Sequence, residues 1–507
     1  MKVVIVGAGI GGLAAALRLA HVGLDVTVLE RAPYPGGKMR SVPVGSSAVE
    51  AGPTVFTMRW VFDELFAECG ADLADHVGLE PATILARHAW RAGETLDLMA
   101  EPEASEAAIA AFAGARERDG YRRFRARAAE VYATLEGPFI RGERPSPVDL
   151  TWRAGLSGLG DLWRIQPFTS LWGALGDYFT DPRLRQLFGR YATYCGSSPF
   201  AAPATLMLVA HVESQGVWHV TGGLSRLAHA VAQLAGERGA RFRYETSARR
   251  IAVSGGRVVG VDLADGERIP ADAVICNADV AGLAEGLLGR EAARGADVVP
   301  APQRSLSAVT LCLSAKAQGF PLARHTVFFS ADYAAEFAQI ARGILPEDPT
   351  IYVCAQDRSD AALDPDGSER LLCLANASAR PFSPSEIETC VTKMRRRLSA
   401  SGLTLADTAE PVTTQPEDFA RLFPGSAGAL YGRASHGWMA SFKRPGARTR
   451  IPGLYLAGGS VHPGPGVPMA AQSGRLAVES LLRDRTRARA SIRGWIATAT
   501  SGGTSTP

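Results

Sequence analysis

The first residues of the chain combine glycines and an acid at spacings that fit the binding of a dinucleotide. Gly7, Gly9 and Gly12 form the pattern GxGxxG. The first glycine permits a tight turn, the second lets the backbone approach a pyrophosphate, and the third allows a helix to pack closely on a strand. The N-terminus of that helix offers free N–H groups to phosphate oxygens. Glu30 follows Gly7 by 23 positions, where a carboxylate can accept both ribose hydroxyls.

The elements that must position these residues follow from the neighbouring sequence. Residues 2–6 form a β-branched run that predicts a strand, and the alanine- and leucine-rich residues 13–22 predict a helix. Residues 25–29 predict a second buried strand, which ends at Glu30. A plain strand–turn–helix without a ligand is the alternative. It does not explain why the strand, the glycine loop, the helix and Glu30 all occur at the spacing of a dinucleotide site.

The residues after Glu30 indicate which dinucleotide to expect. RAPYPGGK follows at residues 31–38, and EAGPT at residues 50–54. The first run resembles the ERxxxxGG(R/K) extension of the amine-oxidase and phytoene-desaturase flavoproteins, in which the double glycine and the base lie along the FAD diphosphate and ribityl chain. The second resembles their loop beside the flavin, where the family more often has aspartate than Glu50. The resemblance implies that the cofactor is FAD.

The resemblance continues through the middle and the end of the chain. The order of motifs is similar to that of bacterial carotenoid desaturases of the phytoene desaturase family, at residues 181–188, 194–199, 216–223, 256–261 and 277–279. Residues 454–469 predict a strand, a glycine turn and a helix whose N-terminus suits the electron-rich edge of a reduced flavin. Residues 431–438 and 459–466 look most like a subgroup that desaturates 1-hydroxycarotenoids at the 3,4 position.

The motifs and the resemblance together assign the site residues. The expected FAD-binding residues are Gly7, Gly9, Gly12, Glu30, Arg31, Gly37, Lys38, Gly52, Thr54, Ile251, Gly459, Val467 and Met469. His436 is the candidate catalytic base, because histidine titrates near neutrality, and a structural histidine held in a loop is the alternative. His462 precedes Pro463 and is expected to shape the flavin loop. His211 and Glu213 lie on an apolar, helix-like run and are candidates for contact with the substrate.

The chain carries a single dinucleotide fingerprint. Flavoproteins reduced by NADPH usually carry a second, so electrons are expected to come from the organic substrate, a carotenoid. They would leave to an external acceptor, oxygen or a quinone. An amine oxidase on the same fold is the alternative enzyme. A prenyl-protein escort or lipid carrier, a class that tends to lose the flavin, is the non-enzymatic alternative.

Composition excludes several other classes. The 507 residues include 54 basic and 51 acidic side chains, and this balance argues against a nucleic-acid partner. The seven cysteines are scattered without a CxxC pair, so no disulfide framework and no metal site is expected. The N-terminus has no secretory pattern, and no apolar run reaches the roughly 18–20 residues that span a bilayer. A cytoplasmic protein, peripherally attached to a membrane, is expected.

These observations predict an α/β fold. A Rossmann-type FAD-binding domain of the amine-oxidase and phytoene-desaturase type would carry an inserted α+β substrate domain and a helical, membrane-facing segment. The FAD-binding domain is expected at 1–70, 201–290 and 421–482, the helical region at 71–200, the substrate domain at 291–420 and a disordered tail at 483–507. Residues 251–261 predict a hairpin around Gly255 and Gly256.

Residues 151–175 have few charges and three tryptophans, Trp152, Trp163 and Trp172. Spacings of three and four between the apolar residues predict a helical face. A pair of core helices is one interpretation. The other is a monotopic patch through which a carotenoid leaves the lipid, because tryptophan and leucine suit a membrane interface.

Overall fold

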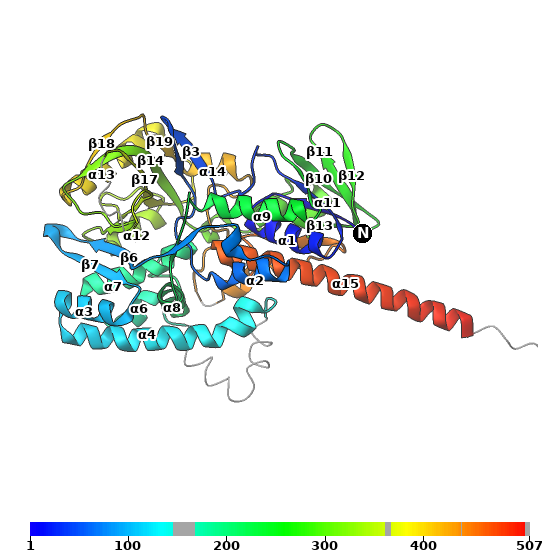
Figure 1. Ribbon diagram of the computed structural model, residues 1–507, viewed down its shortest axis with the longest axis horizontal. Coiled ribbons are helices and arrows are strands. Elements are labelled where there is room, and N and C mark those ends of the chain that lie inside the picture. The colour runs from blue at the N-terminus through cyan, green and yellow to red at the C-terminus, as the bar shows by residue number, and fades with distance from the viewer. Residues whose placement is uncertain (146–167, 360–366, 438, 502–507) are drawn as a thin grey trace, which may run out of the picture.

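In the computed structural model, which describes residues 1–145, 168–359, 367–437 and 439–501, two sheet-centred parts stand side by side (Figure 1). The part on the right of the view contains the N-terminus and the helices α1, α9 and α15. The part on the left contains β14, β17 and β18, and below it lies a layer of helices that includes α3, α4, α6 and α8.

The first part is built on a parallel sheet with the strand order β20-β13-β1-β2-β9. Its strands come from three separate stretches of the chain, and they are β1 (Lys2–Val6), β2 (Asp25–Leu29), β9 (Arg241–Arg243), β13 (Ala273–Cys276) and β20 (Leu454–Leu456). Valine and isoleucine dominate β1 and β13 because both faces of this sheet are covered. The Rossmann-type arrangement predicted from the sequence is confirmed.

Helices cover this parallel sheet and bring its three stretches together. α1 (Ile10–His21) packs against both α9 (Ser225–Glu237) and α15 (Val467–Ser501). α1 is buried over almost its whole length, and its small alanines let the neighbouring helices approach closely. The predicted hairpin is also confirmed, because β10 (Ala248–Ser254) and β11 (Arg257–Leu263) pair antiparallel across Gly255 and Gly256, both at positive φ.

The second part is a mixed sheet in the order β18-β14-β17-β16-β15-β6-β7, with β19 paired to β14. Its strands are β6 (Ile84–Ala89), β7 (Thr95–Met99), β14 (Ser307–Gln318), β15 (His325–Phe328), β16 (Ile351–Ala355), β17 (Glu369–Ala377), β18 (Thr404–Asp407) and β19 (Val412–Thr414). Two helices, α12 (Tyr333–Ala341) and α13 (Pro384–Ala400), lie between its strands in the chain.

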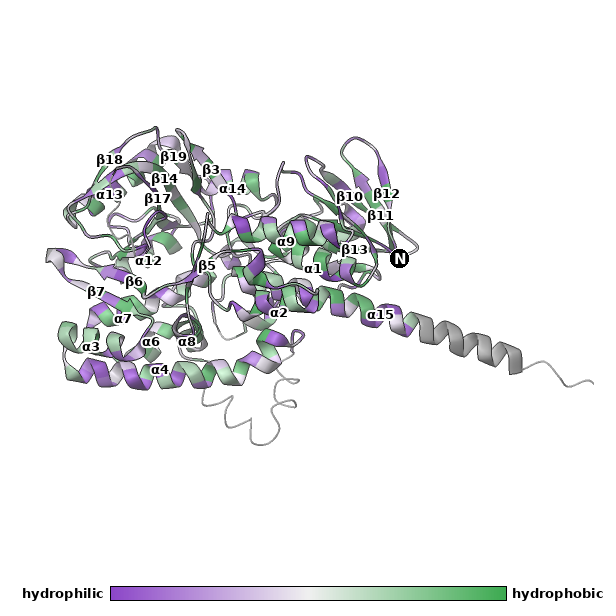
Figure 2. Ribbon diagram, viewed as in Figure 1, coloured by the Kyte–Doolittle hydropathy of each residue, from purple (hydrophilic) through white to green (hydrophobic). Residues whose placement is uncertain are grey.

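The region 71–200, which the sequence predicts to be helical, contains strands as well as helices. α3 (Pro102–Ala113) and α4 (Ala115–Leu135) are helices, but β6 and β7 form a hairpin that extends the second sheet through a parallel pairing with β15. Because β6 and β15 are more than 200 residues apart in the chain, no local sequence pattern predicts that they pair. In α4, Tyr121, Phe124, Ala128 and Val131 are buried at spacings of three and four, and its arginines are exposed or partly exposed. Hydrophilic and hydrophobic residues alternate along this helix (Figure 2).

The remaining elements connect these layers. They include β3 (Ser41–Val44), β4 (Ser47–Glu50), α2 (Trp60–Glu68), β5 (Leu79–Pro81), a π-helix (Glu136–Arg141), α6 (Leu171–Leu175), α7 (Pro182–Gly189), a 3-10 helix (Arg190–Cys195), α8 (Leu208–Ser214), β8 (Trp218–Val220), β12 (Arg268–Pro270), α10 (Val280–Ala284), α11 (Arg290–Ala293) and α14 (Pro416–Leu422).

The prediction of a disordered tail at 483–507 is wrong for residues 483–501, and residues 502–507 lie outside the described residues. α15 continues to Ser501 and projects from the body of the protein (Figure 1). Arginine and alanine, the commonest residues of this stretch, are strong helix formers, so it extends a helix that tertiary packing has already nucleated. Of the helices in the described ranges, none is long and apolar enough to cross a membrane.

The apolar stretch 151–175 is described only in part. Trp152 and Trp163 lie outside the described residues. Trp172, in α6, is partly buried and packs its ring 4.7 Å from the ring of Phe200. At this position the packing favours the interpretation as core.

Candidate active site

A large cavity of about 1340 Å³ collects residues from both parts of the protein. One side of it is lined by the glycine loop after β1, by the loop after β2 and by the loop that precedes α15. The other side is lined by apolar residues of the helical layer and by strands of the second sheet, such as Leu372 and Leu374 of β17. We refer to it as the central cavity.

The glycine loop has the shape expected for binding a pyrophosphate. Gly7 has a φ of 98°, which only glycine adopts readily, and it turns the chain from β1 into α1. A Cβ on Gly12 would lie 2.3 Å from the Gly7 carbonyl oxygen, so the helix can only pack this closely on a glycine. Gly9 lines the central cavity as the N-cap of α1, and no side chain caps this helix end. Its first N–H groups therefore fit a phosphate.

Glu30 lies at the end of β2, buried and in the wall of the central cavity. Its Oε2 accepts the Ala8 N–H at 2.8 Å, and its Oε1 accepts the Ala32 N–H at 2.8 Å. The two backbone bonds hold the carboxylate in place and leave each oxygen a further lone pair. This arrangement fits an acceptor of ribose hydroxyls.

The basic residues of the same loop differ in their surroundings. Lys38 lines the central cavity, donates from Nζ to the Leu430 carbonyl oxygen at 2.6 Å and lies 5.3 Å from the centre of the Phe423 ring. Burial lowers the pKa of its ammonium group, and the charge of Asp279 opposes that shift. Arg31 is exposed at the cavity edge, where it donates to the Arg421 carbonyl oxygen at 2.8 Å.

The loops expected beside the flavin also reach the central cavity. Gly37, Gly52, Thr54, Gly459, Val467 and Met469 all belong to its lining. A Cβ on Gly52 would lie 2.0 Å from the Lys38 carbonyl oxygen, which explains the glycine. The Thr54 Oγ1 and the Tyr352 hydroxyl are 2.6 Å apart, so this loop is joined to the second sheet.

Two polar residues that were not among the predicted site residues, Arg444 and Asn277, lie at the same place. Arg444 is 2% exposed and donates to the carbonyl oxygens of Tyr431, at 3.0 Å, and Gly459, at 3.2 Å. Burial lowers the pKa of its guanidinium to about 10. Asn277 lines the cavity next to the glycine loop, and its buried Oδ1 has no hydrogen-bond partner among the described residues. An unsatisfied amide oxygen in this position fits a site that a polar cofactor completes.

Ile251 and His436 are not in the cavity wall formed by the described residues. Ile251 is fully buried behind it, and its backbone N–H donates to Leu288, which does line the cavity. His436 is exposed, and its Nε2 accepts the Ser198 N–H at 3.2 Å. Because its neighbour Ser435 lines the cavity and it does not, the geometry favours the structural alternative for His436.

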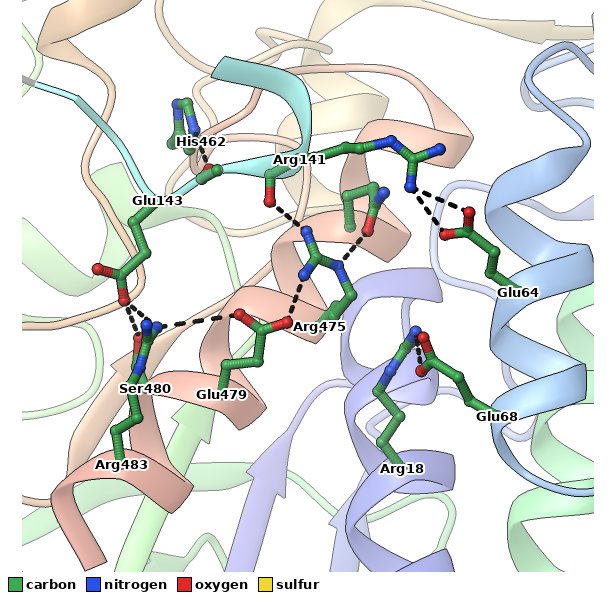
Figure 3. A network of polar contacts seen from close by, with 12 residues as sticks. Arg18, Glu64, Glu68, Arg141, Glu143, His462, Arg475, Glu479, Ser480 and Arg483 are labelled. Atoms are coloured by element: carbon green, nitrogen blue, oxygen red, sulfur yellow. Dashed lines mark hydrogen bonds and ion pairs between the residues drawn. The ribbon is translucent and has the colours of Figure 1, made fainter. Parts of the chain in front are cut away.

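A polar network holds the loop at residues 459–466, which is expected to lie beside the flavin, against the π-helix (Figure 3). The Nε2 of His462 lies 3.1 Å from the Gly142 carbonyl oxygen, and its ring packs edge-on against Phe139 at 4.6 Å. Arg475 of α15 donates to the Arg141 carbonyl oxygen at the end of the π-helix. His462 thus shapes this loop by packing, as the sequence predicts.

The fold and the central cavity are those of a flavin-dependent oxidoreductase. Residues 10–482 match the family described as flavin-containing amine oxidoreductase, and the chain belongs to that family, whose cofactor is FAD. It is 53% identical over 490 residues to the hydroxyneurosporene desaturase of Rubrivivax gelatinosus, covering 95% of this chain and 93% of that protein. It is 47% identical over 497 residues to the hydroxyneurosporene desaturase of Cereibacter sphaeroides, covering 95% and 98%.

A comparison with solved structures gives the same fold at lower sequence similarity. Putrescine oxidase bound to putrescine superposes with a TM-score of 0.60 at 14% identity, covering 95% of this chain and 99% of that one.

Proposed function

We propose that the chain is an FAD-dependent carotenoid desaturase that introduces the 3,4 double bond into a 1-hydroxycarotenoid such as hydroxyneurosporene. The observation that carries this proposal is a single cavity lined by a dinucleotide loop and by apolar walls, in a chain about half identical to hydroxyneurosporene desaturases. Forming a double bond from a C–C single bond removes two hydrogens, as a hydride equivalent and a proton. FAD, when bound, supplies the acceptor for the hydride equivalent.

The residues of this chain hold the cofactor and exclude water. The N–H groups at the start of α1 would bind the pyrophosphate, Glu30 the ribose, and the loops at Gly52 and Gly459 the flavin. Leu206, Leu208, Val209 and Val212 would pack along the polyene. An apolar wall suits a hydrocarbon, because it removes the substrate from water without leaving polar groups unsatisfied.

The electron acceptor and the membrane are further parts of the proposal. A single dinucleotide fingerprint supports an external acceptor, oxygen or a quinone, and turnover that does not depend on NADPH. A carotenoid is held in lipid, which supports collection of the substrate at a membrane surface by a peripherally attached protein. Turnover that starts only when NADPH is added to enzyme, FAD and substrate would contradict the first part.

The proposal is tested by producing the protein in bacterial cells that accumulate a 1-hydroxycarotenoid and recording the pigment spectrum. Each added conjugated double bond moves the absorption to the red, so one new band at longer wavelength is expected. Cells with the same pathway and a Glu30→Ala variant are the control for FAD dependence. A purified protein that binds FAD, in cells whose pigments stay unchanged, would contradict the proposed function.

A further inference from the structure

A cluster of charged and hydroxyl side chains interrupts the apolar half of the central cavity. Arg190 and Tyr194 come from the 3-10 helix that follows α7, and Glu213 comes from α8. All three line the cavity, together with Leu206 and Val209. Tyr191 belongs to the same network but does not line the cavity as the described residues form it.

The cluster is a connected network of hydrogen bonds. Arg190 donates from Nη1 to the Tyr194 hydroxyl at 2.8 Å, and that hydroxyl donates to Glu213 Oε1 at 3.0 Å. The Tyr191 hydroxyl donates to Glu213 Oε2 at 2.5 Å. Nη2 of Arg190 lies 3.9 Å from Glu213 Oε1, beyond hydrogen-bond distance.

The network is buried and still has unused hydrogen-bonding capacity. Arg190 is 6% exposed and Glu213 2% exposed. Nε and Nη2 of Arg190 have no hydrogen-bond partner within the described part of the chain. Burial raises the pKa of Tyr194, so its hydroxyl keeps its proton and stays a donor. These nitrogens are already shielded from water and lack an acceptor among the described residues, which is unfavourable unless a ligand supplies one, and a hydrocarbon cannot.

The chemistry of the cluster indicates a neutral ligand with a hydroxyl group. One arginine and one glutamate balance each other in charge, so a charged ligand gains no net attraction. A hydroxyl can accept from the arginine and donate to the carboxylate or to the tyrosine oxygen. The surrounding leucines and valines are suited to a carbon chain attached to that hydroxyl.

The cluster also stands close to the loops expected at the flavin. Gly196, which follows the 3-10 helix, packs so tightly on Tyr431 that a Cβ would lie 2.3 Å from the ring. Arg444 joins the Tyr431 carbonyl oxygen to that of Gly459. A hydroxyl held by Tyr194 therefore belongs to the end of the substrate that reacts and not to the distant end.

We infer that Arg190, Tyr194 and Glu213 bind the tertiary hydroxyl of the substrate's end group and so place the bond two carbons away for desaturation. The inference rests on the proposed function and names the residues that select its substrate. It explains why an enzyme for an almost wholly apolar molecule buries an ion pair in its cavity. In a 1-hydroxycarotenoid, the 3,4 bond lies near enough to the hydroxyl for one anchor to set both the choice of substrate and the position of reaction.

The test compares Tyr194→Phe with the matched control Tyr191→Phe. Both variants remove one hydroxyl that donates to Glu213, but only Tyr194 lines the cavity. The substrates are a 1-hydroxycarotenoid and its 1-deoxy analogue, in which hydrogen replaces the hydroxyl. The measured quantity is the ratio of kcat/KM for the two. We expect Tyr194→Phe to lower this ratio about tenfold and Tyr191→Phe to change it by less than about twofold.

Binding gives a readout that does not need turnover. Quenching of flavin fluorescence should show weaker binding of the hydroxylated substrate to Tyr194→Phe, with unchanged binding of the deoxy analogue. If Tyr194→Phe does not retain FAD, Glu213→Gln takes its place, because glutamine keeps the shape and one acceptor oxygen. The wild-type protein provides a test without any variant, since it should favour the hydroxylated substrate.

The outcomes separate this inference from the proposed function. A wild-type enzyme that desaturates both substrates equally well overturns the inference and leaves the desaturase function standing. Equal losses on both substrates in Tyr194→Phe also overturn it, because they indicate a purely structural role. A wild-type protein that binds FAD and desaturates neither substrate overturns the proposed function itself.

Discussion

At the scale of single residues, Glu30 has two tasks that one substitution can measure. In the structure its carboxylate already accepts two backbone N–H groups, and we propose that the same oxygens accept the FAD ribose hydroxyls. Glu30→Ala should weaken FAD binding by about 1–3 kcal/mol, because buried hydroxyls lose their acceptor. Titration of the FAD-free protein with FAD measures the effect. Glu237→Ala, an exposed residue at the end of α9, is the control. FAD affinity equal to wild type in Glu30→Ala would show that the ribose binds elsewhere.

We expect His462 to make the free energy of unfolding depend on pH. Burial lowers the pKa of its imidazole to about 4, from an ordinary value near 6.5, and its Nδ1 has no partner among the described residues. The unfolded chain therefore binds the proton more tightly than the folded protein. The stabilisation is complete above pH 6.5 and is lost as the pH falls toward 4, by at most roughly 3 kcal/mol.

Denaturant unfolding at a series of pH values tests this prediction. A His462→Gln variant cannot titrate in this range, so its unfolding free energy should fall less steeply between pH 6.5 and 4 than that of the wild type. His21→Gln, at the exposed end of α1, should keep the wild-type slope. If wild type and His462→Gln have the same slope, another group is responsible.

Site residues could be predicted from the sequence where a single local motif contains them. Gly7, Gly12 and Glu30 belong to one strand–turn–helix–strand unit, so their spacing alone predicts how they meet. Asn277 meets the Gly7 loop from 270 residues away, and no spacing shows this. Arg444 is only 15 residues from Gly459, but it lies outside any motif recognised in the sequence, so its role could not be predicted either. Glu213 was predicted as a substrate contact from its apolar surroundings, but its partner Arg190 was not.

At the scale of elements, α15 supports the cavity through contacts with the π-helix. Arg475, whose side chain is 17% exposed, donates to the Arg141 carbonyl oxygen and to Glu479 (Figure 3). Arg475→Met should lower the unfolding free energy by about 1–3 kcal/mol, because the carbonyl at the end of the π-helix loses a charged donor. Thermal unfolding measures the change.

The same helix offers a control for that prediction. Arg483 forms an ion pair with Glu143, and both side chains are more than a third exposed. Arg483→Met should change the unfolding free energy by less than about 1 kcal/mol, since exposed pairs are screened by water and salt. Equal losses of unfolding free energy in the two variants would show that the buried contacts of Arg475 stabilise the protein no more than the exposed ion pair of Arg483 does.

The elements themselves were predicted where the pattern is local. The strands β1 and β2 and the hairpin β10–β11 follow from β-branched runs and turn glycines. β6 and β7 were missed because pairing with β15 places them in a sheet, and a sequence pattern does not show a distant partner. The extension of α15 was missed because an arginine-rich tail resembles a disordered segment unless a packed helix precedes it.

At the scale of the whole molecule, the substrate's insolubility requires an account of how it reaches the central cavity. Each methylene exposed to water costs about 0.8 kcal/mol, so a carotenoid stays in the bilayer. The described helices include none that could hold the protein there by crossing the membrane. Phe168 lines the central cavity and is also 62% exposed, so apolar surface continues from the cavity to the outside. We propose that this edge of the cavity faces the lipid.

Phe168→Ser tests that proposal. An aromatic ring at a membrane interface contributes through burial of its apolar surface, which serine cannot replace. We expect less Phe168→Ser than wild-type protein to float with liposomes. Its turnover of membrane-held carotenoid should fall more than its turnover of carotenoid dispersed in detergent, while its FAD content stays at the wild-type level. Ile344→Ser is the matched control, because Ile344 is 48% exposed and does not line the cavity formed by the described residues. Equal liposome binding by Phe168→Ser and wild type would show that the protein meets the membrane through another surface. Loss of flavin from Phe168→Ser would show that this ring supports the FAD site and does not act only at the membrane.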